Sequence, residues 1–261
     1  MLILTALSEL RMSMVQRRDP ALLTRRHRTV GRVAAILEAA AIDDAGVRLS
    51  TLAELLDAPK SSVHGLLKGL VSVGYLTEVD GAYTLGPALH ALLGATERPL
   101  LEEVAAGTMR KLRDEFDETV LLGHRMGDSI VYLAAEESRQ LIKYVPRINT
   151  RRPVLFTSMG KIYLAELDRV DREAYVAKRV TNQRRRKALL TQLDEVARTG
   201  IAVNRNETEP GLSGVGAAIR ERDELIACLS VSGPSDRLVP LLPRLSKAVK
   251  AAASRVSAQL P

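Results

Sequence analysis

The chain has 261 residues, of which 46% are hydrophobic and only 3% aromatic, with no Trp, a net charge of +7 and a single cysteine. This length exceeds one typical domain, so we expect a small domain and a larger one. The scarcity of aromatic residues disfavours a stacking platform for single-stranded nucleic acid. Cys228 alone allows neither an internal disulfide nor a cysteine-based metal cluster, and a cytoplasmic protein fits best.

The first 27 residues combine an apolar start with a basic stretch. Residues 1–15 lack the basic beginning and the clean cleavage site of a signal peptide, and no run of the chain approaches the roughly 18 apolar residues that span a membrane. Five arginines follow, at positions 17, 18, 25, 26 and 28. They indicate either a basic N-terminal arm that contacts DNA phosphates or the minor groove, or a solvated and disordered tail. A misplaced start codon would also explain residues 1–27.

Residues 50–86 carry the most informative pattern in the chain. Ser50 is placed to cap a first helix that ends before Pro59, and a second helix is expected to start at Ser61 or Ser62. Apolar residues recur in the second helix at i, i+3, i+4 and i+7, which predicts one buried stripe with a polar face opposite.

A hairpin is predicted directly after these helices. Residues 75–79 and 82–85 are short strand-like runs, and Asp80-Gly81 between them suits a two-residue type I′ turn. Helix, turn, helix and hairpin in this order are typical of a winged helix-turn-helix whose second helix reads a DNA groove. The alternative is an ordinary helical hairpin beside a β-hairpin in a larger core. The conjunction of all the parts favours DNA binding.

The positive net charge lies mostly outside the predicted DNA-binding segment, so it does not support DNA binding by that segment. Lys and Arg nearly balance Asp and Glu in residues 1–86, whereas residues 87–261 carry most of the surplus. Part of that surplus is the run at residues 184–187, which is most often a solvated loop or a helix start. The high isoelectric point is therefore weak evidence for DNA binding.

A linker helix is predicted at residues 87–98 and a second domain at residues 99–261. The predicted helices of this domain are 100–116, 158–167, 189–198 and 240–260, and the predicted strands are 119–124, 129–134, 200–203, 214–219 and 225–231. Helices packed against an antiparallel sheet give an α+β, sensor-like domain.

Motifs that would indicate catalysis or nucleotide binding are incomplete. Gly160-Lys161 lacks both the upstream glycine of a phosphate-binding loop and the Ser or Thr that would hold magnesium. The glycines at 211, 214 and 216 have the wrong order for a dinucleotide fingerprint. His124 lacks a nucleophile motif beside it. The sequence therefore predicts no catalytic residue, no metal site and no cofactor.

Four segments occur in the order and spacing of one known family. They are PKSSVH at residues 59–64, GYL at 74–76, PVLFTSMGKIYLA at 153–165 and LSVSGP at 229–234. In these segments, and across nearly all of residues 28–260, the chain resembles the IclR family of bacterial transcriptional regulators. The resemblance implies a winged helix-turn-helix at 28–86, a linker helix that aids dimerisation, and a GAF-like effector-binding domain with an antiparallel sheet. It also implies a small-molecule effector, often an organic or aromatic acid.

The resemblance places an effector pocket in the second domain. The predicted effector-binding residues are Met159, Gly160, Glu207, Ala218, Ser230 and Ser232. We expect the small residues Gly160 and Ala218 to leave room for a ligand, and the hydroxyls of Ser230 and Ser232 to share one strand face and donate to a carboxylate. The alternative for the two serines is a half-buried strand with a wet polar side. The family usually has Pro or a small polar residue where Ala218 stands, so the ligand chemistry stays open.

The polar face of the second helix supplies the predicted contacts with DNA. These residues are Lys60, Ser61, Ser62, His64, Gly65, Lys68 and Ser72. The family commonly has Arg at the position of Gly65, and neither Gly65 nor Gly69 supplies a hydrogen bond to a base edge. His64 and Lys68 remain for the bases, so we expect weaker or more shape-dependent reading than in a typical relative.

The sequence thus predicts a ligand-responsive transcriptional regulator, as a repressor or an activator. Its predicted partners are double-stranded DNA and a small-molecule effector, with no membrane, and it is expected to bind palindromic sites as a homodimer or dimer of dimers. The alternative is a metabolite-binding protein whose degenerate helix-turn-helix serves assembly. An enzyme is the least favoured class.

Overall fold

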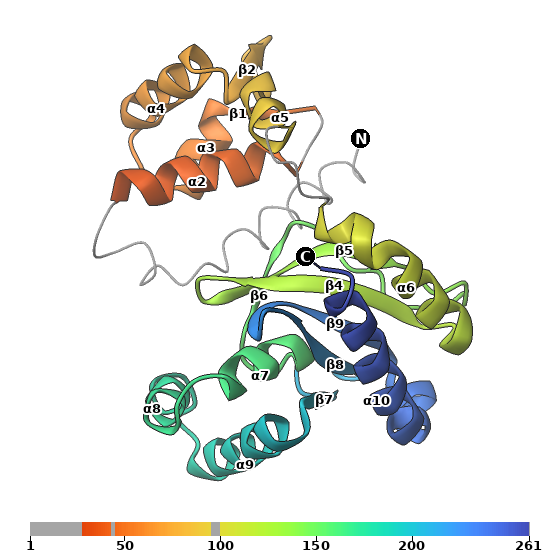
Figure 1. Ribbon diagram of the computed structural model, residues 1–261. Helices are drawn as coiled ribbons and strands as arrows, with labels where there is room; N and C mark the ends of the chain where they lie inside the picture. The colour runs from red at the N-terminus through yellow and green to blue at the C-terminus, as the bar shows by residue number, and fades with distance from the viewer. Residues whose placement is uncertain (1–27, 43–44, 95–99, 261) are drawn as a thin grey trace. The chain divides into compact units, whose positions relative to one another are not determined.

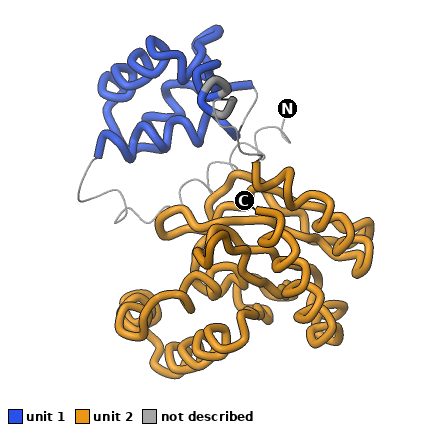
Figure 2. Tube along the Cα trace, in the orientation of Figure 1, with its two compact units in different colours: residues 1–98 blue, residues 99–261 orange. Residues whose placement is uncertain are grey.

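The computed structural model describes residues 28–42, 45–94 and 100–260 (Figure 1). The chain divides into two compact units, residues 1–98 and residues 99–261 (Figure 2). The first unit encloses one apolar core and the second encloses two, one on each face of its sheet. The predicted arm at 1–27 lies outside the described residues.

The first unit combines helices with a small sheet. Its elements are α2 (Arg28–Ala40), β1 (Val47–Arg48), α3 (Leu49–Leu55), α4 (Lys60–Ser72), β2 (Leu76–Val79), β3 (Ala82–Leu85) and α5 (Pro87–Gly94). The strands pair antiparallel in the order β1-β3-β2. Ile36 of α2, Leu52 of α3 and Leu67 of α4 are buried in the same core. The predicted winged helix-turn-helix is confirmed.

The first helix of the motif begins two residues earlier than the Ser50 cap requires. Arg48 is still extended and pairs with Ala82 in the sheet, and α3 begins immediately after it, at Leu49. Ser50 therefore lies inside the helix, and no side chain caps it. The expectation that Ser50 caps this helix is wrong, because the strand leads straight into the first turn.

The second helix also begins earlier than predicted. α4 starts at Lys60, not at Ser61 or Ser62, and Pro59 occupies the N-cap position. The carbonyl of Pro59 accepts hydrogen bonds from the amides of Ser62 and Val63, so the first helical turn closes directly after the proline. A proline suits this place because its own missing N–H is not needed there.

The predicted wing follows α4 with the expected turn. Asp80 and Gly81 both have positive φ, 51° and 73°, as a type I′ turn requires. The first strand begins at Leu76 instead of Tyr75, because the amide of Tyr75 donates to the carbonyl of Leu70 and completes the end of α4.

The second unit is built on a six-stranded antiparallel sheet in the order β6-β5-β4-β9-β8-β7. Its strands are β4 (Thr119–Met126), β5 (Ser129–Glu136), β6 (Arg151–Pro153), β7 (Ile201–Arg205), β8 (Leu212–Glu221) and β9 (Glu224–Pro234). Its helices are α6 (Leu101–Phe116), α7 (Ser158–Ala165), α8 (Arg169–Arg179), α9 (Gln183–Thr199) and α10 (Ser235–Ser257). This confirms the α+β prediction for the domain.

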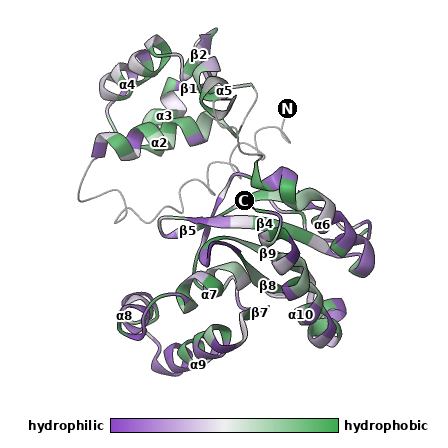
Figure 3. Cartoon of the chain, viewed as in Figure 1, coloured by the Kyte–Doolittle hydropathy of each residue, from purple (hydrophilic) through white to green (hydrophobic). Residues whose placement is uncertain are grey.

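The helices cover the two faces of this sheet in separate groups. α6 and α10 pack on one face and α7 and α9 on the other (Figure 1). β8 and β9 consist largely of hydrophobic residues, whereas α8 and α9 are largely hydrophilic (Figure 3). Alternate residues of β9 therefore face different cores, with Val231 toward α10 and Cys228 toward α7.

Several elements of the second unit differ from prediction. β6 and α8 were not predicted from the sequence, and α9 begins early enough for the basic run at 184–187 to form its first turn. α10 begins at Ser235 and not at Pro240, because Leu238 packs its first turn into the core while Pro240 and Pro243 lie on the exposed side. Within the described ranges, no helix is long and apolar enough to cross a membrane.

Candidate functional site

Helix α4 presents an exposed face of small residues opposite its buried stripe. Val63, Leu67 and Leu70 are buried in the core of the first unit and fix the helix orientation. At about 100° per residue, Gly65 lies near the middle of the opposite face. The residues of the predicted DNA contact are exposed, apart from the half-buried His64: Lys60, Ser61, Ser62, Gly65, Lys68 and Ser72. The structure therefore brings the predicted residues together on α4.

The two glycines of α4 are not required by packing. A Cβ added at Gly65 or at Gly69 would meet no atom within 4 Å. Ser72 donates its hydroxyl to the carbonyl of Gly69 at 2.7 Å, and Nδ1 of His64 is buried with no partner in the described part of the chain. Lys68 is thus the long, charged side chain in the middle of the face, and the backbone at the glycines is open to close approach.

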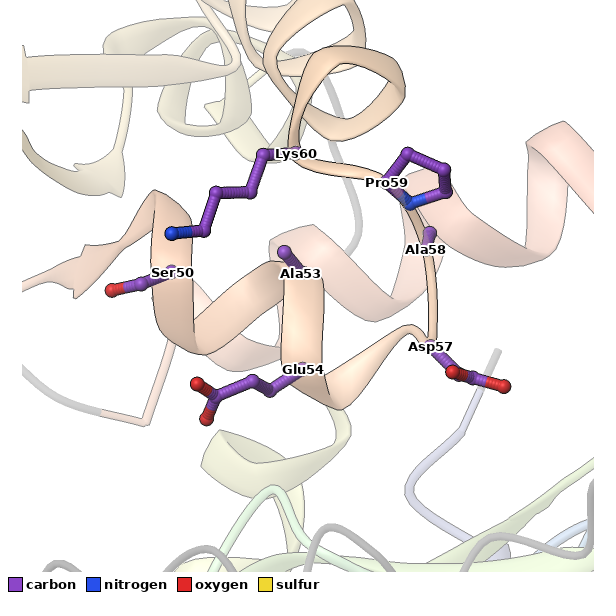
Figure 4. Close-up of a pocket in the computed structure, with 7 residues that line it drawn as sticks. All are labelled: Ser50, Ala53, Glu54, Asp57, Ala58, Pro59 and Lys60. Carbon is purple, nitrogen blue, oxygen red and sulfur yellow. The ribbon is translucent and has the colours of Figure 1, made fainter.

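A shallow depression of about 310 Å³ lies beside the turn of the helix-turn-helix (Figure 4). Its lining residues are Ser50, Ala53, Glu54, Asp57, Ala58, Pro59 and Lys60. Figure 4 shows Lys60 at one edge and the carboxylates of Glu54 and Asp57 at the opposite edge. Mixed charge of this kind does not suit a phosphate or carboxylate ligand. We therefore assign no ligand to this depression, which is part of the surface beside the turn.

The predicted effector residues of β9 lie on the sheet face that α7 covers. Ser230 pairs with Leu121 of β4, and Ser232 pairs with Thr119. Leu121 belongs to the core under α7, and cross-strand partners share a face. The exposed fractions of Ser230 and Ser232 are 1% and 8%, and their Oγ atoms lie 3.5 Å apart. The predicted common strand face is therefore correct, and it is buried instead of wet.

The start of α7 packs tightly against the same face. Thr157 caps the helix by accepting from the amide of Gly160 at 2.9 Å. A Cβ on Gly160 would lie 1.8 Å from the carbonyl oxygen of Val154. The expectation that Gly160 leaves room for a ligand is therefore wrong, because the glycine is needed for backbone contact. Met159 is buried, and its sulfur lies 2.8 Å from where a Cβ of Gly123 would be.

Glu207 forms an ion pair with the buried Lys161, which was not anticipated. Nζ of Lys161 lies 2.6 Å from Oε1 of Glu207 and 2.7 Å from the carbonyl oxygen of Val203. Burial lowers the pKa of Lys161, and the carboxylate of Glu207 opposes this shift. In the sequence, Lys161 is considered only as part of an incomplete nucleotide-binding motif. A charged residue within an apolar helix could have indicated that this lysine is buried with a partner. Lys161 therefore neutralises the charge of Glu207.

Ala218 of β8 pairs with Cys228 of β9, at the edge of the α7 core. Cys228 is buried, and burial raises the pKa of its thiol, which makes it a poor nucleophile. Burial also lowers the pKa of the half-buried His124, with Glu102 opposing the shift. The described residues contain no group of three or more His, Cys, Asp or Glu that could hold a metal ion.

Family models match both units. The model for "Bacterial transcriptional regulator IclR C-terminal" matches residues 94–258, and the model for "IclR helix-turn-helix domain" matches residues 29–80. The chain belongs to the IclR family. It is therefore a DNA-binding transcriptional regulator with an effector-binding domain, in a family that is not enzymatic.

Characterised and solved relatives of this IclR-family protein cover most of its length. It is 30% identical to the transcriptional regulator KdgR of Escherichia coli K12, over 89% of this chain and 92% of KdgR. It is 28% identical to KipR of Bacillus subtilis, over 81% of this chain and 89% of KipR. An IclR homologue from Microbacterium hydrocarbonoxydans, solved with 4-hydroxybenzoate, has the same fold with a TM-score of 0.72 and 23% identity, covering 89% and 98% of the two chains.

Proposed function

We propose that this IclR-family regulator binds a palindromic operator as a homodimer and releases or rearranges that DNA when a small organic acid binds beneath α7. The observation that carries the proposal is the sheet face at β9, where two buried hydroxyls lie together and Lys161 neutralises the nearby carboxylate. Hydroxyl donors without a competing negative charge suit the oxygen atoms of such a ligand.

The DNA contact is assigned to the exposed face of α4. Lys60, Ser61 and Ser62 lie at its N-terminus, where backbone N–H groups also favour phosphate, while Lys68 lies in the middle. Gly65 and Gly69 let the helix backbone approach the groove closely but supply few base contacts. We therefore propose that operator recognition depends strongly on DNA shape.

The effector contact is assigned to Met159, Gly160, Glu207, Ala218, Ser230 and Ser232. The structural relative from Microbacterium hydrocarbonoxydans was solved with 4-hydroxybenzoate, which makes a carboxylic acid a reasonable first probe for this chain. We further propose that the linker at residues 87–98 transmits effector binding as a change in the spacing of the two DNA-binding units of a dimer.

DNase footprinting on the upstream region of the protein's own gene tests the proposal. We expect protection of a palindromic site at low salt, and a change in that protection with 4-hydroxybenzoate or related acids. The variant Ser230→Ala/Ser232→Ala is the matched control, because it leaves α4 intact. It should bind the DNA normally but lose the response to acid. Sedimentation measurements on the same samples give the oligomeric state.

Absence of protection at low salt would contradict operator binding at this site. That result would favour the alternative in which the helix-turn-helix serves assembly, for which the glycines at 65 and 69 are the supporting observation. The family membership favours DNA binding.

A further inference from the structure

Arg152 occupies an unusual place on the sheet. It lies in β6, the edge strand, between the exposed residues Arg151 and Pro153. Arg152 itself is half-buried and pairs with Ile130 of β5, which belongs to the core under α7. Because cross-strand partners share a face, the side chain of Arg152 lies on the α7 side of the sheet. The predicted effector residues of β9 lie on the same side.

The guanidinium of Arg152 has no partner in the described part of the chain. Its Nε is buried and unbonded, and no ion pair or other hydrogen bond joins it to the described residues. Other half-buried arginines of this unit are paired: Arg179 with Asp128 at 2.6 Å and Arg237 with Glu118 at 2.6 Å. A buried donor without a partner costs free energy, so the unbonded Nε of Arg152 is unfavourable in the unliganded fold.

A tyrosine lies beside Arg152 on this sheet face. Tyr132, on the same sheet face, is nearly buried, and its hydroxyl contacts that of Tyr144. Burial raises the pKa of Tyr132, with the charge of Arg152 opposing the shift, so the phenol remains a neutral donor. The amide of Asn149 donates to the carbonyl of Tyr132 at 2.9 Å and holds the covering loop against β5.

This environment is continuous with the proposed effector site. A Cβ on Gly123 would lie 2.8 Å from the sulfur of Met159 and 3.2 Å from the ring of Tyr132, so Met159 and Tyr132 meet above Gly123. Tyr132 therefore lies between Arg152 and Met159. Two strands, β5 and β4, separate β6 from β9. Arg152 is level with Arg125 of β4 and Ser230 is level with Leu121, so Arg152 and the serines lie well apart on one covered face, with Met159 between them.

We propose that Arg152 binds the carboxylate of the effector through its planar guanidinium, at the β6 end of this face. The body of the acid then lies against Tyr132 and extends toward Met159. A guanidinium holds a carboxylate by two parallel hydrogen bonds, which a lysine ammonium or a neutral residue does not reproduce. This deepens the proposed function and rests on it. It assigns the specificity for acids over neutral analogues to Arg152.

Thermal unfolding and calorimetric binding of the full chain test this assignment with Arg152→Met, a variant of similar length. The probes are benzoate, 4-hydroxybenzoate and hexanoate, each compared with its amide at constant ionic strength. We expect at least one acid, but not its amide, to raise the Tm of the wild-type protein. Arg152→Met should weaken that binding by about 10- to 100-fold, with a smaller loss in Arg152→Lys. Arg151→Met, on the opposite face one residue away, should retain the binding.

A second readout does not depend on the choice of acid. Because Arg152 is unpaired and partly desolvated, unliganded Arg152→Met should have a Tm equal to or above that of the wild-type protein. The proposal is overturned if Arg152→Met unfolds clearly below the wild type, or if no acid in the series binds in a manner that depends on Arg152. Operator binding by unliganded Arg152→Met is measured separately, so a failure of DNA regulation is distinguishable from a failure of acid binding.

Discussion

Lys161 and Glu207 form an ion pair across 46 residues of sequence, with Nζ 2.6 Å from Oε1. Lys161 belongs to α7, and Glu207 belongs to the loop between β7 and β8. The same loop reaches α10, because Oδ1 of Asn206 accepts from the hydroxyl of Ser235 at 2.6 Å. The pair therefore joins the helix that carries Met159 to a loop that also contacts the final helix.

Breaking this pair from one side should be destabilising. Lys161→Met leaves the carboxylate of Glu207, whose side chain is 20% exposed, without its partner, and we expect a loss of about 2 kcal/mol in the free energy of unfolding. The double variant Lys161→Met/Glu207→Gln removes both charges and should recover part of this loss. Urea unfolding of the two single variants and the double variant gives the coupling energy. Additive effects of the two substitutions would show that the pair is not coupled.

The pair also predicts a difference in pH dependence. Burial lowers the pKa of Lys161 from 10.5, and Glu207 opposes that shift. In Glu207→Gln the opposing charge is absent, so the pKa of Lys161 falls further below that of the unfolded chain. The unfolded state then binds more protons at alkaline pH, and the free energy of unfolding of the variant should rise relative to wild type as the pH approaches 10.5. Urea unfolding at several pH values checks this, and parallel profiles would contradict it.

Local sequence patterns predicted the features that depend on neighbouring residues. Asp80-Gly81 specifies its own turn through backbone conformation, and the wing formed as expected. The predicted ends of the helices were less accurate. The start of α3 depends on the sheet pairing of Arg48, and the start of α4 depends on the carbonyl of Pro59 as an acceptor, and no short sequence pattern contains either contact. α8 was not predicted because its apolar stripe is weak. Its buried residues are Arg172 and Val176.

The candidate sites depend on contacts between distant segments, which the sequence does not display. The alternation at Ser230 and Ser232 predicted their shared face correctly, but only the pairing of β9 with β4 shows that the face is buried. Likewise, Gly160 is small because Val154 approaches it, not because a ligand needs space. The unbonded Nε of Arg152 is visible only once the edge of the sheet is packed, and no sequence pattern indicates it.

Adding an arginine at the centre of α4 should improve DNA reading. A side chain at Gly65 meets no atom within 4 Å, so Gly65→Arg fits the fold and should raise helix stability by about 0.5–1 kcal/mol. An added guanidinium that reaches a guanine should tighten operator binding by about tenfold and sharpen sequence selectivity. Gly65→Ala is the control for helix propensity. Electrophoretic mobility shifts that give equal affinity and specificity for Gly65→Arg and Gly65→Ala would refute the proposed orientation of α4.

Lys68 should contribute electrostatic affinity for DNA. It is exposed on the α4 face, so Lys68→Ala should weaken binding to all sequences and reduce the slope of log affinity against log salt by about 1. Lys247→Ala removes an equal charge from an exposed position on α10 in the other unit, and should leave the slope unchanged. Fluorescence anisotropy across a salt series makes the comparison. An equal loss in both variants would indicate a general charge effect instead of a contact by α4.

Gly160 and Gly107 form a matched pair for testing the tight packing of α7. A Cβ at Gly160 would lie 1.8 Å from the carbonyl of Val154, whereas one at Gly107 in α6 would meet nothing within 4 Å. Gly160→Ala forces the loop before α7 to shift and should lower the free energy of unfolding by more than about 2 kcal/mol. Gly107→Ala should raise it by about 0.5–1 kcal/mol through helix propensity. Because Gly160 also belongs to the proposed effector site, acid binding is measured on the folded variant below its Tm. Similar stabilities for the two variants would mean that α7 can move away from Val154, and that the close contact does not hold the helix in place.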